Sequence, residues 1–413
     1  MRSIEQVDCS GAWTSGRAVS SVASFRVDFV REWSLAAACW DNSVHATPFQ
    51  QMYWLDAWYR AFDTVAPLIA IISDIATGQQ VALVPLIVRV RNGIRIAEFA
   101  DCGLTDYNAP ILGCCASSDA AQARALCQAL LAALRRLPDG IDLIRFKKMP
   151  VNVGGKPNPL ALLGRTGSSS LNGNLVEMGD NLDAHNSSIK KMQMPRYWRV
   201  FNRHPGATFR VVTDRDEALA VLDTMDVQQG DRMERLGLKF FLSDDCCGKF
   251  YRNLVARGLE AGYVVISTLT CDEGVVATTL GIRQGADYVL LRTSNAGIKW
   301  SSCSPGLLTI DRTMAALHKQ GVRRFDLSIG NYSYKRRFGA VHVPLTDASL
   351  ALSWRGLPFM MRDRAAQWLR RYPRLADPVR RACKNAKWID RIIGVPVFDH
   401  EVPTPAARIQ TPG

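Results

Sequence analysis

Asp326 is the residue with the clearest potential for proton chemistry. It lies between Phe325 and Leu327 in the run 323–328, which alternates as a β-strand does. A carboxylate in such a strand is costly to bury unless a cation or hydrogen bonds stabilise it. Two roles fit Asp326, and the sequence leaves both open: a structural ion pair, or a general base that accepts a proton.

Polar side chains follow Asp326 within ten residues. Tyr334 carries a phenol that can protonate a departing group, and Tyr332 carries another. Lys335 either binds a phosphate or neutralises Asp326, and neutralisation is the simpler interpretation. We expect Asp326, Tyr334 and Lys335 to form a catalytic group.

A helix start precedes this strand. Ser304 is a residue type that caps helices, Pro305 suits the first helical position, and Gly306 lets a ligand approach the backbone. Apolar residues at helical spacing predict a helix over 305–320. The first amides of a helix are unpaired and the dipole is positive there, so Ser304, Gly306 and Leu307 are candidates to bind a phosphate or pyrophosphate.

Composition limits the classes of protein. With 413 residues and 47% hydrophobic content, the chain is long enough for two or three globular domains. The formal net charge of +13 favours an anionic partner: a nucleotide cofactor, nucleic acid, an anionic lipid surface or an acidic glycan. The eleven cysteines show no C-x-x-C pair and no histidine at zinc-ligand spacing, so we expect reduced thiols and no metal site. Without a signal-peptide core or a run of about 18 apolar residues, we expect a cytoplasmic protein or one peripheral to the inner face of a membrane.

The order of expected elements repeats once along the chain. The first copy consists of strand 25–32, helices 33–40 and 51–62, strands 66–73, 81–90 and 94–100, helix 118–137 and strand 141–147. The second copy consists of strand 207–212, helices 216–229 and 244–261, strands 263–270, 275–283 and 287–292, helix 305–320 and strand 323–328. This repeat predicts an α/β protein of two tandem lobes, each with a mixed, mainly antiparallel sheet flanked by helices.

The repeat also sets the expected domain boundaries. In chain order they are a loose leader (1–24), an N-terminal lobe (25–177), a linker (178–206), a C-terminal lobe (207–352) and a basic tail (353–413). Residues 150–173 are rich in Gly, Pro, Asn and Ser, which predicts a flexible connection. Basic and aromatic residues are interleaved over 185–204, which fits either contact with nucleic acid or a solvated helix between the lobes.

The tail is basic, with aromatic residues among the charges. Residues 355–391 hold eleven basic and three acidic side chains. Such a segment suits an anionic lipid surface, and a helix packed back onto a lobe is the alternative.

Four short motifs together resemble a known family. They are Thr47-Pro48-Phe49-Gln50 before a tryptophan-rich helix, Gly103-Leu104-Thr105-Asp106-Tyr107, Ser304-Pro305-Gly306-Leu307-Leu308, and Phe325-Asp326-Leu327 followed by Gly330 and Tyr334-Lys335. They are similar to motifs of the CelD/BcsL-type GNAT acyltransferases, a family associated with cellulose and exopolysaccharide biosynthesis. The two-lobed plan also resembles the Fem-type transferases. The resemblance covers most of both lobes, although the glycine-rich Q/R-x-x-G-x-G/A loop usual in GNAT lobes is absent.

The resemblance implies transfer of an acyl group from acyl-CoA to an amine-bearing acceptor. It places the pyrophosphate at the helix start around Gly306. The strand 288–292 would run beside the pantetheine arm and donate an N–H to the thioester carbonyl, with Arg292 as a further cofactor-binding candidate. Asp326 would accept the amine proton, directly or through a water, and Tyr334 or Tyr332 would protonate the sulfur.

The acceptor is expected between the lobes. Asp106 and Tyr107 are candidates to face it, although a plain Asx-type turn explains Asp106 equally well. Arg232 would bind an acidic acceptor, and an ordinary surface arginine is the alternative.

Three hypotheses follow. The first is an acyl-CoA-dependent N-acyltransferase of polysaccharide or envelope lipid biosynthesis. The second is a Fem-like transferase that uses aminoacyl-tRNA, whose binding would weaken steeply with salt. The third is a non-catalytic accessory of a polysaccharide synthase, for which changes at Asp326 or Lys335 would leave function intact.

Overall fold

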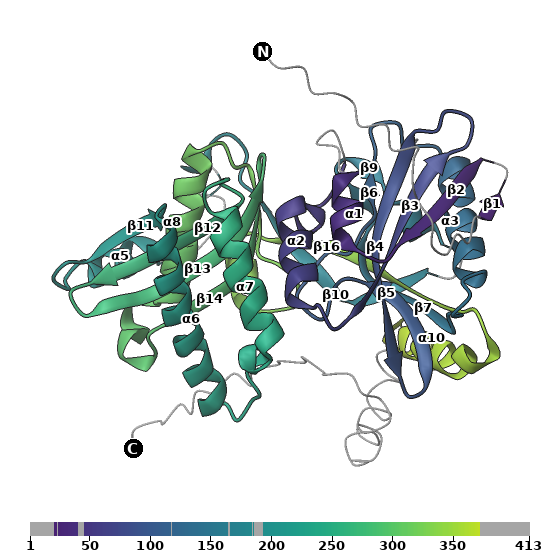
Figure 1. Cartoon of the computed structure of the whole chain (residues 1–413). Helices are drawn as coiled ribbons and strands as arrows, with labels where there is room; N and C mark the ends of the chain where they lie inside the picture. Colours follow the sequence, from purple (N-terminus) through teal and green to yellow (C-terminus); the bar gives the residue numbers. More distant parts are fainter. Residues whose placement is uncertain are drawn as a thin grey trace.

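The computed structural model shows two lobes that lie side by side (Figure 1). It describes residues 20–22, 24–39, 45–116, 118–163, 166–183, 185 and 193–371. Most of the expected leader, part of the linker and the tail beyond residue 371 lie outside the described residues.

One mixed sheet of 14 strands runs through both lobes in the described part of the chain, in the order β1-β2-β3-β4-β5-β7-β16-β10-β15-β14-β13-β12-β11, with β6 paired to β4. The strands on the N-terminal side are β1 (Ser20–Val22), β2 (Phe25–Val30), β3 (Ala66–Asp74), β4 (Gln80–Arg91), β5 (Ile94–Phe99), β6 (Ile111–Leu112) and β7 (Leu143–Pro150). Those on the C-terminal side are β11 (Thr208–Val212), β12 (Val264–Cys271), β13 (Gly274–Gln284), β14 (Asp287–Asn295) and β15 (Arg324–Asp326). Between them lie β10 (Thr166–Glu177) and β16 (Val341–Ala351), while β8 (Asn152–Val153) and β9 (Lys156–Pro157) form a separate hairpin.

Helices flank this sheet (Figure 1). The α-helices are α1 (Trp33–Ala38), α2 (Met52–Ala61), α3 (Ala120–Arg135), α5 (Met194–Phe201), α6 (Arg215–Arg235), α7 (Asp245–Gly258), α8 (Pro305–Lys319), α9 (Ser333–Arg337) and α10 (Leu357–Arg371). Short 3-10 helices are η1 (Pro48–Gln50), η2 (Pro159–Leu162), η3 (Phe241–Ser243), η4 (Ile298–Cys303) and η5 (Trp354–Gly356). The two predicted series of helices and strands are confirmed element by element, with α6 six residues longer than expected at its C-terminus (Gln229 to Arg235).

The flexible connection predicted for residues 150–173 is wrong. Residues 166–177 form β10, a long strand in the middle of the sheet that pairs with β16 on one side and β15 on the other. Glycine, serine and asparagine have low strand propensity, but pairing on both sides supplies hydrogen bonds that local sequence does not reveal. β16 was not predicted, and it links β10 to β7 of the N-terminal side.

A shared apolar core joins the lobes. Helix α2 lies against α7, with the fully buried Trp54 and Phe250 rings edge to face and their centroids 4.8 Å apart. Tyr263 donates its hydroxyl to the carbonyl of Pro48 at 2.6 Å. Burying such an aromatic side chain contributes about 1.5–3 kcal/mol, so this contact fixes one lobe against the other.

The strands β14 and β15 separate after a short parallel pairing. The last paired residues are Val289 of β14 and Asp326 of β15, although β14 continues to Asn295. On its other edge β14 bulges, because Leu290 and Arg292 lie opposite the adjacent residues Gly281 and Leu280 of β13 and Leu291 is left over. Among the described strands, none pairs with β14 beyond Val289 on the β15 side.

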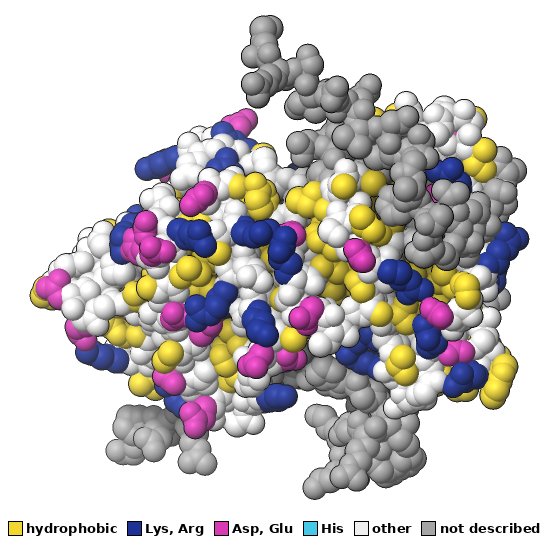
Figure 2. Space-filling model, in the orientation of Figure 1, with side chains coloured by type: hydrophobic (Ala, Val, Ile, Leu, Met, Phe, Trp, Pro, Cys, Tyr) yellow, Lys and Arg dark blue, Asp and Glu magenta, His cyan; other side chains and the backbone are white. Residues whose placement is uncertain are grey.

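Surface charge on the visible face is mixed. Figure 2 shows lysine and arginine side chains over α6 and α7 with acidic side chains among them. Within the described residues, no helix is both long enough and apolar enough to span a membrane.

Candidate active site

Asp326 and Tyr107 meet where the two lobes join. Asp326 is the last residue of β15 and is 8% exposed. Its Oδ2 accepts a hydrogen bond from the Tyr107 hydroxyl at 2.5 Å, and its Oδ1 accepts one from the Ser328 amide at 2.6 Å. Because Tyr107 comes from the N-terminal lobe, both lobes complete this site.

Burial sets the protonation of this pair. Desolvation raises the pKa of Asp326 to about 6, against the lowering effect of the hydrogen bonds from Tyr107 and Ser328. Burial, and secondarily the adjacent Asp326 carboxylate, raise the pKa of Tyr107 well above its usual range. Tyr107 therefore stays a donor, and Asp326 is a carboxylate at neutral pH with a pKa suited to accepting a proton.

The Thr47-Pro48-Phe49-Gln50 motif holds Tyr107 in place. Gln50 donates its Nε2 to the Tyr107 carbonyl at 2.8 Å, and the Phe49 ring lies edge-on to the Tyr107 ring at 5.6 Å. The Thr47 hydroxyl accepts a hydrogen bond from the Phe49 amide at 3.2 Å and donates one to the side-chain oxygen of Gln50. The motif thus holds the backbone and the ring of Tyr107 in place.

Two residues of β10 were missed as members of the site. Gly173 lies so close to Tyr107 that a Cβ atom there would be 2.2 Å from the phenol oxygen. Asn174 donates its Nδ2 to the carbonyls of Ser328 at 2.7 Å and Gly330 at 3.0 Å. A glycine within a strand signals close approach of another group, but only once the strand itself is recognised.

Asp106 and Lys335 surround the turn after β15. The hydroxyl of Ser328, another missed residue, donates to the carboxylate of Asp106. Lys335 is 2% exposed and donates its Nζ to the carbonyls of Ser328 at 3.0 Å and Ile329 at 2.7 Å. Ser328 has a left-handed backbone (φ 68°), which is unfavourable for a non-glycine residue. Lys335 therefore stabilises a strained turn.

Lys335 acts on the carboxylates through its charge. Burial lowers its pKa to about 8, while the charges of Asp106 and Asp326 oppose that shift. Burial likewise raises the pKa of Asp106, and the charge of Lys148 opposes that shift most strongly. Among the described residues, no ion pair of Lys335 with either aspartate is found.

Tyr334 lies on α9 beside Lys335, and the charge of Arg232 on α6 acts on it. Burial raises the pKa of Tyr334 to about 12, and the charge of Arg232 opposes that shift. The Tyr332 ring stacks on Tyr334 with centroids 6.0 Å apart. Arg232 itself is exposed on α6, so its guanidinium is accessible to an acidic group.

The start of α8 differs from the expected cap. Ser304 has a left-handed backbone (φ 45°), and its side chain accepts no hydrogen bond from the helix, whereas a capping residue is normally extended. The prediction of a Ser304 cap is therefore wrong. The amides of Gly306 and Leu307 are left without a capping side chain, and Leu308 is the first amide to bond back, to the Ser304 carbonyl at 3.0 Å.

Two side chains of β14 face this helix start. A Cβ on Gly306 would lie 3.8 Å from Asn295 Nδ2 and 4.0 Å from Thr293 Oγ1. The Thr293 hydroxyl is buried and has no hydrogen-bond partner in the described part of the structure. These donors fit an anionic group at the positive end of α8.

Arg292 is directed at α6. It is 4% exposed, and its guanidinium donates to Asp226 and Gln229, each at 2.6 Å. It also lies 4.6 Å from the centre of the Tyr251 ring. The structure thus uses Arg292 to join β14 to α6 and α7 at the bulge.

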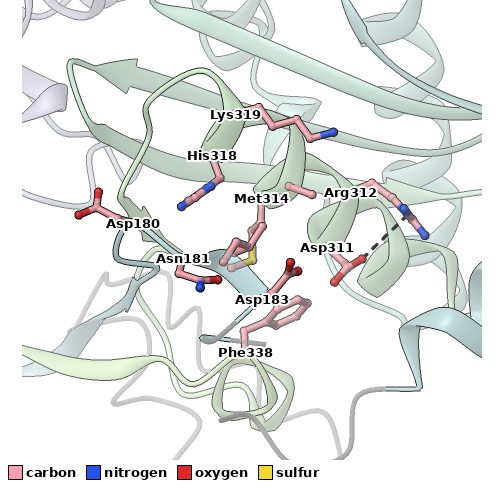
Figure 3. A pocket seen from close by; sticks show the side chains of 11 residues that line it. Asp180, Asn181, Asp183, Asp311, Arg312, Met314, His318, Lys319 and Phe338 are labelled. Atoms are coloured by element: carbon pink, nitrogen blue, oxygen red, sulfur yellow. Dashed lines mark ion pairs between the residues drawn. The ribbon is translucent and has the colours of Figure 1, made fainter. Parts of the chain in front are cut away.

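A separate cavity of about 590 Å³ lies beside the C-terminal half of α8. Figure 3 shows Asp311, Met314 and His318 on one side, with Asp183 and Phe338 opposite. It contains none of the candidate site residues. Within the described residues, no group of three or more His, Cys, Asp or Glu side chains is arranged to hold a metal ion.

Comparisons with known proteins bear on the fold. Residues 190–336 match the acetyltransferase (GNAT) domain. A structure of FemX is similar, with 10% sequence identity, a TM-score of 0.51, and coverage of 75% of this chain and 94% of FemX. A conserved protein of unknown function from Bacteroides thetaiotaomicron has 10% sequence identity and a TM-score of 0.48, and the match covers 79% of this chain and 99% of that protein. No curated protein matches.

The matched domain and the repeated topology confirm the predicted fold of two tandem GNAT-like lobes. The likeness to FemX concerns the fold.

Proposed function

We propose that this chain, an acyltransferase with a GNAT domain at residues 190–336, transfers an acyl group from acyl-CoA to an amine held where its lobes meet. One observation carries the proposal: Tyr107 of the N-terminal lobe donates to Asp326 of the C-terminal lobe at the point where β14 and β15 separate. A buried base thus lies beside an open strand edge.

The residues around the α8 start suit the donor. The amides of Gly306 and Leu307 and the hydroxyl of Thr293 offer hydrogen bonds to a pyrophosphate. The bulge at Leu291 breaks the regular pairing of β14, and an N–H on the open edge would polarise a thioester carbonyl. When bound, acyl-CoA supplies the activated acyl group.

Asp326 accepts the proton of the attacking amine. With a pKa of about 6 it is ionised at pH 7.5, and each carboxylate oxygen keeps a lone pair after bonding Tyr107 and Ser328. Deprotonation makes the amine nucleophilic, which a transfer to a carbonyl requires.

Tyr334 serves the departing thiolate as a hydrogen-bond donor. With a pKa of about 12 its phenol would lose a proton to a thiolate, whose reference pKa is about 8.5, only at a cost of about 5 kcal/mol. A donated hydrogen bond stabilises the thiolate without that cost. Arg232, exposed nearby, is available to bind an acidic acceptor.

The acceptor is proposed to belong to polysaccharide or envelope lipid biosynthesis in the cytoplasm. Support comes from the CelD/BcsL-like motifs, since residues 47–50 hold Tyr107 and the 103–107 loop supplies both Asp106 and Tyr107. Transfer from aminoacyl-tRNA is the competing function.

The test is an acyl-transfer assay. The protein is incubated with acetyl-CoA or a long-chain acyl-CoA and a panel of amino sugars and lipid amines, and free thiol and acylated product are measured. Asp326→Asn should lower kcat/KM by about 100-fold or more, while the exposed Asp223→Asn should not. Consumption of aminoacyl-tRNA alone, weakened steeply by salt, would overturn the proposal, as would full activity of Asp326→Asn.

A further inference from the structure

Helix α10 has a fixed inner face. Met360 is buried, and Asp363 accepts hydrogen bonds from Arg145 of β7 at 2.8 Å and Ser349 of β16 at 3.0 Å. Gln367 donates to the carbonyl of Asp347 at 3.3 Å. Positions 360, 363 and 367 lie on one side of a helix, so the rotation of α10 on the sheet is set.

Large apolar side chains of α10 and of the preceding η5 are exposed to solvent. Leu357 is 45% exposed and Met361 65%, and they are one helical turn apart. Trp354, in η5 just before the helix, is 79% exposed, and Trp368, further along α10, is 52% exposed. An apolar group of this kind on a protein surface marks a place of interaction.

Arginine side chains border this group. Arg355 is exposed next to Trp354, and Arg362 is partly exposed on α10. The one acidic residue of the helix, Asp363, is shared by Arg145 at 2.8 Å and Arg362 at 3.0 Å, so one carboxylate faces two guanidinium charges. The outer face is therefore apolar and cationic.

We propose that this outer face, which we call the docking face (Trp354, Leu357 and Met361, with Arg355 and Arg362), binds an anionic lipid surface. Its tryptophan and aliphatic side chains enter the headgroup region, and its arginines pair with anionic headgroups. This inference goes beyond the proposed acyl transfer and does not depend on it.

Charge favours lipid over the other occupants. A second copy on a two-fold axis would set the same arginines against one another. Residues 372–413 hold seven basic and four acidic side chains, so that segment is also repelled by a cationic face. An anionic bilayer satisfies both the charge and the apolar surface.

The test is vesicle co-sedimentation of the full chain. Vesicles of phosphatidylcholine alone are compared with vesicles that also contain phosphatidylglycerol. The variant Trp354→Ser/Leu357→Ser/Met361→Ser removes the apolar part of the docking face, and Ile75→Ser/Val227→Ser, at residues 51% and 63% exposed elsewhere, is the matched control. Circular dichroism and thermal unfolding verify that both variants fold.

The wild type and the control should bind the anionic vesicles, more weakly at high salt, and the triple variant should bind at least about tenfold less. Failure of the wild type to bind, equal binding to both vesicle types, or unchanged binding by the triple variant would overturn the proposal. A wild-type dimer in solution that the triple variant abolishes, without vesicle binding, would instead assign the face to a second copy.

Discussion

Changing Tyr107 to phenylalanine should move the acid limb of the pH–rate profile to higher pH. The Tyr107 hydroxyl donates to Asp326 at 2.5 Å and so stabilises the ionised carboxylate. Its loss leaves Asp326 with the Ser328 amide in a site where burial already disfavours charge. The pKa of Asp326 therefore rises further above about 6.

The size of the shift follows from the strength of the lost bond. A hydrogen bond to a charged group contributes about 1.5–3 kcal/mol, and about 1.4 kcal/mol corresponds to one pKa unit, so the limb should move by about 1 to 2 units. With a midpoint near 7.5, the variant at pH 6.5 would have about one eighth of the wild-type fraction of ionised Asp326. At pH 9 the two proteins would be almost equally ionised.

The assay is kcat/KM for thiol release from acyl-CoA between pH 5 and pH 9.5. Tyr53→Phe is the matched control, because Tyr53 also lies where the lobes meet, stacked on Tyr263 at 5.4 Å, but is not part of the site. Its acid limb should coincide with that of the wild type.

An unmoved acid limb in Tyr107→Phe would refute this reasoning. If Asp326→Asn were then inactive, Asp326 would still be the general base, but the hydrogen bond from Tyr107 would not set its pKa. If Asp326→Asn were also active, Asp326 would not be the base.

Three further predictions concern stability, measured by denaturant unfolding. Gly173→Ala should destabilise the protein by about 1–3 kcal/mol, because its Cβ would lie 2.2 Å from the Tyr107 hydroxyl oxygen, and adding Tyr107→Phe should recover part of that loss. Asp326→Asn should exceed the wild type in stability by up to about 3 kcal/mol at pH 8, because a raised folded pKa penalises the ionised form above pH 6, and this gap should vanish by about pH 3. Lys335→Met should lose at least about 2 kcal/mol, because two backbone carbonyls lose their donor, whereas Lys299→Met on the surface should change little.

The elements with strong periodicity were predictable. The spacing of apolar residues and the Pro305 and Gly321 signals gave a helix over 305–320, and the structure has Pro305–Lys319. The meander of β3, β4 and β5 followed from alternation and from turns at Gly78 and Gly93, both with positive φ. These signals are local, so a single sequence contains them.

β10 could not be predicted in this way. Its residues favour loops, and its stability comes from β15 and β16, which are far along the chain. Gly173 is explained only when Tyr107 is placed against it. The Ser304 cap was mistaken for a related reason, since residue type does not reveal a left-handed backbone.

The candidate site was predicted as separate pieces. Asp326 and Tyr107 were both named from their motifs, but they are 219 positions apart, and no spacing rule reports a hydrogen bond across the lobes. Ser328 and Asn174 were missed because they act through the turn after β15, whose geometry depends on β10.

The most direct test of the central claim is titration calorimetry of acyl-CoA with the wild type, Gly306→Ala and Gly306→Glu. A Cβ at Gly306 would meet only ordinary contacts, the nearest at 3.8 Å from Asn295, so the alanine variant should bind acyl-CoA as the wild type does. The glutamate variant puts negative charge at the helix start and should abolish binding. No binding of any acyl-CoA by the wild type, or undiminished binding by Gly306→Glu, would contradict the assignment of this protein as an acyl-CoA-dependent acyltransferase.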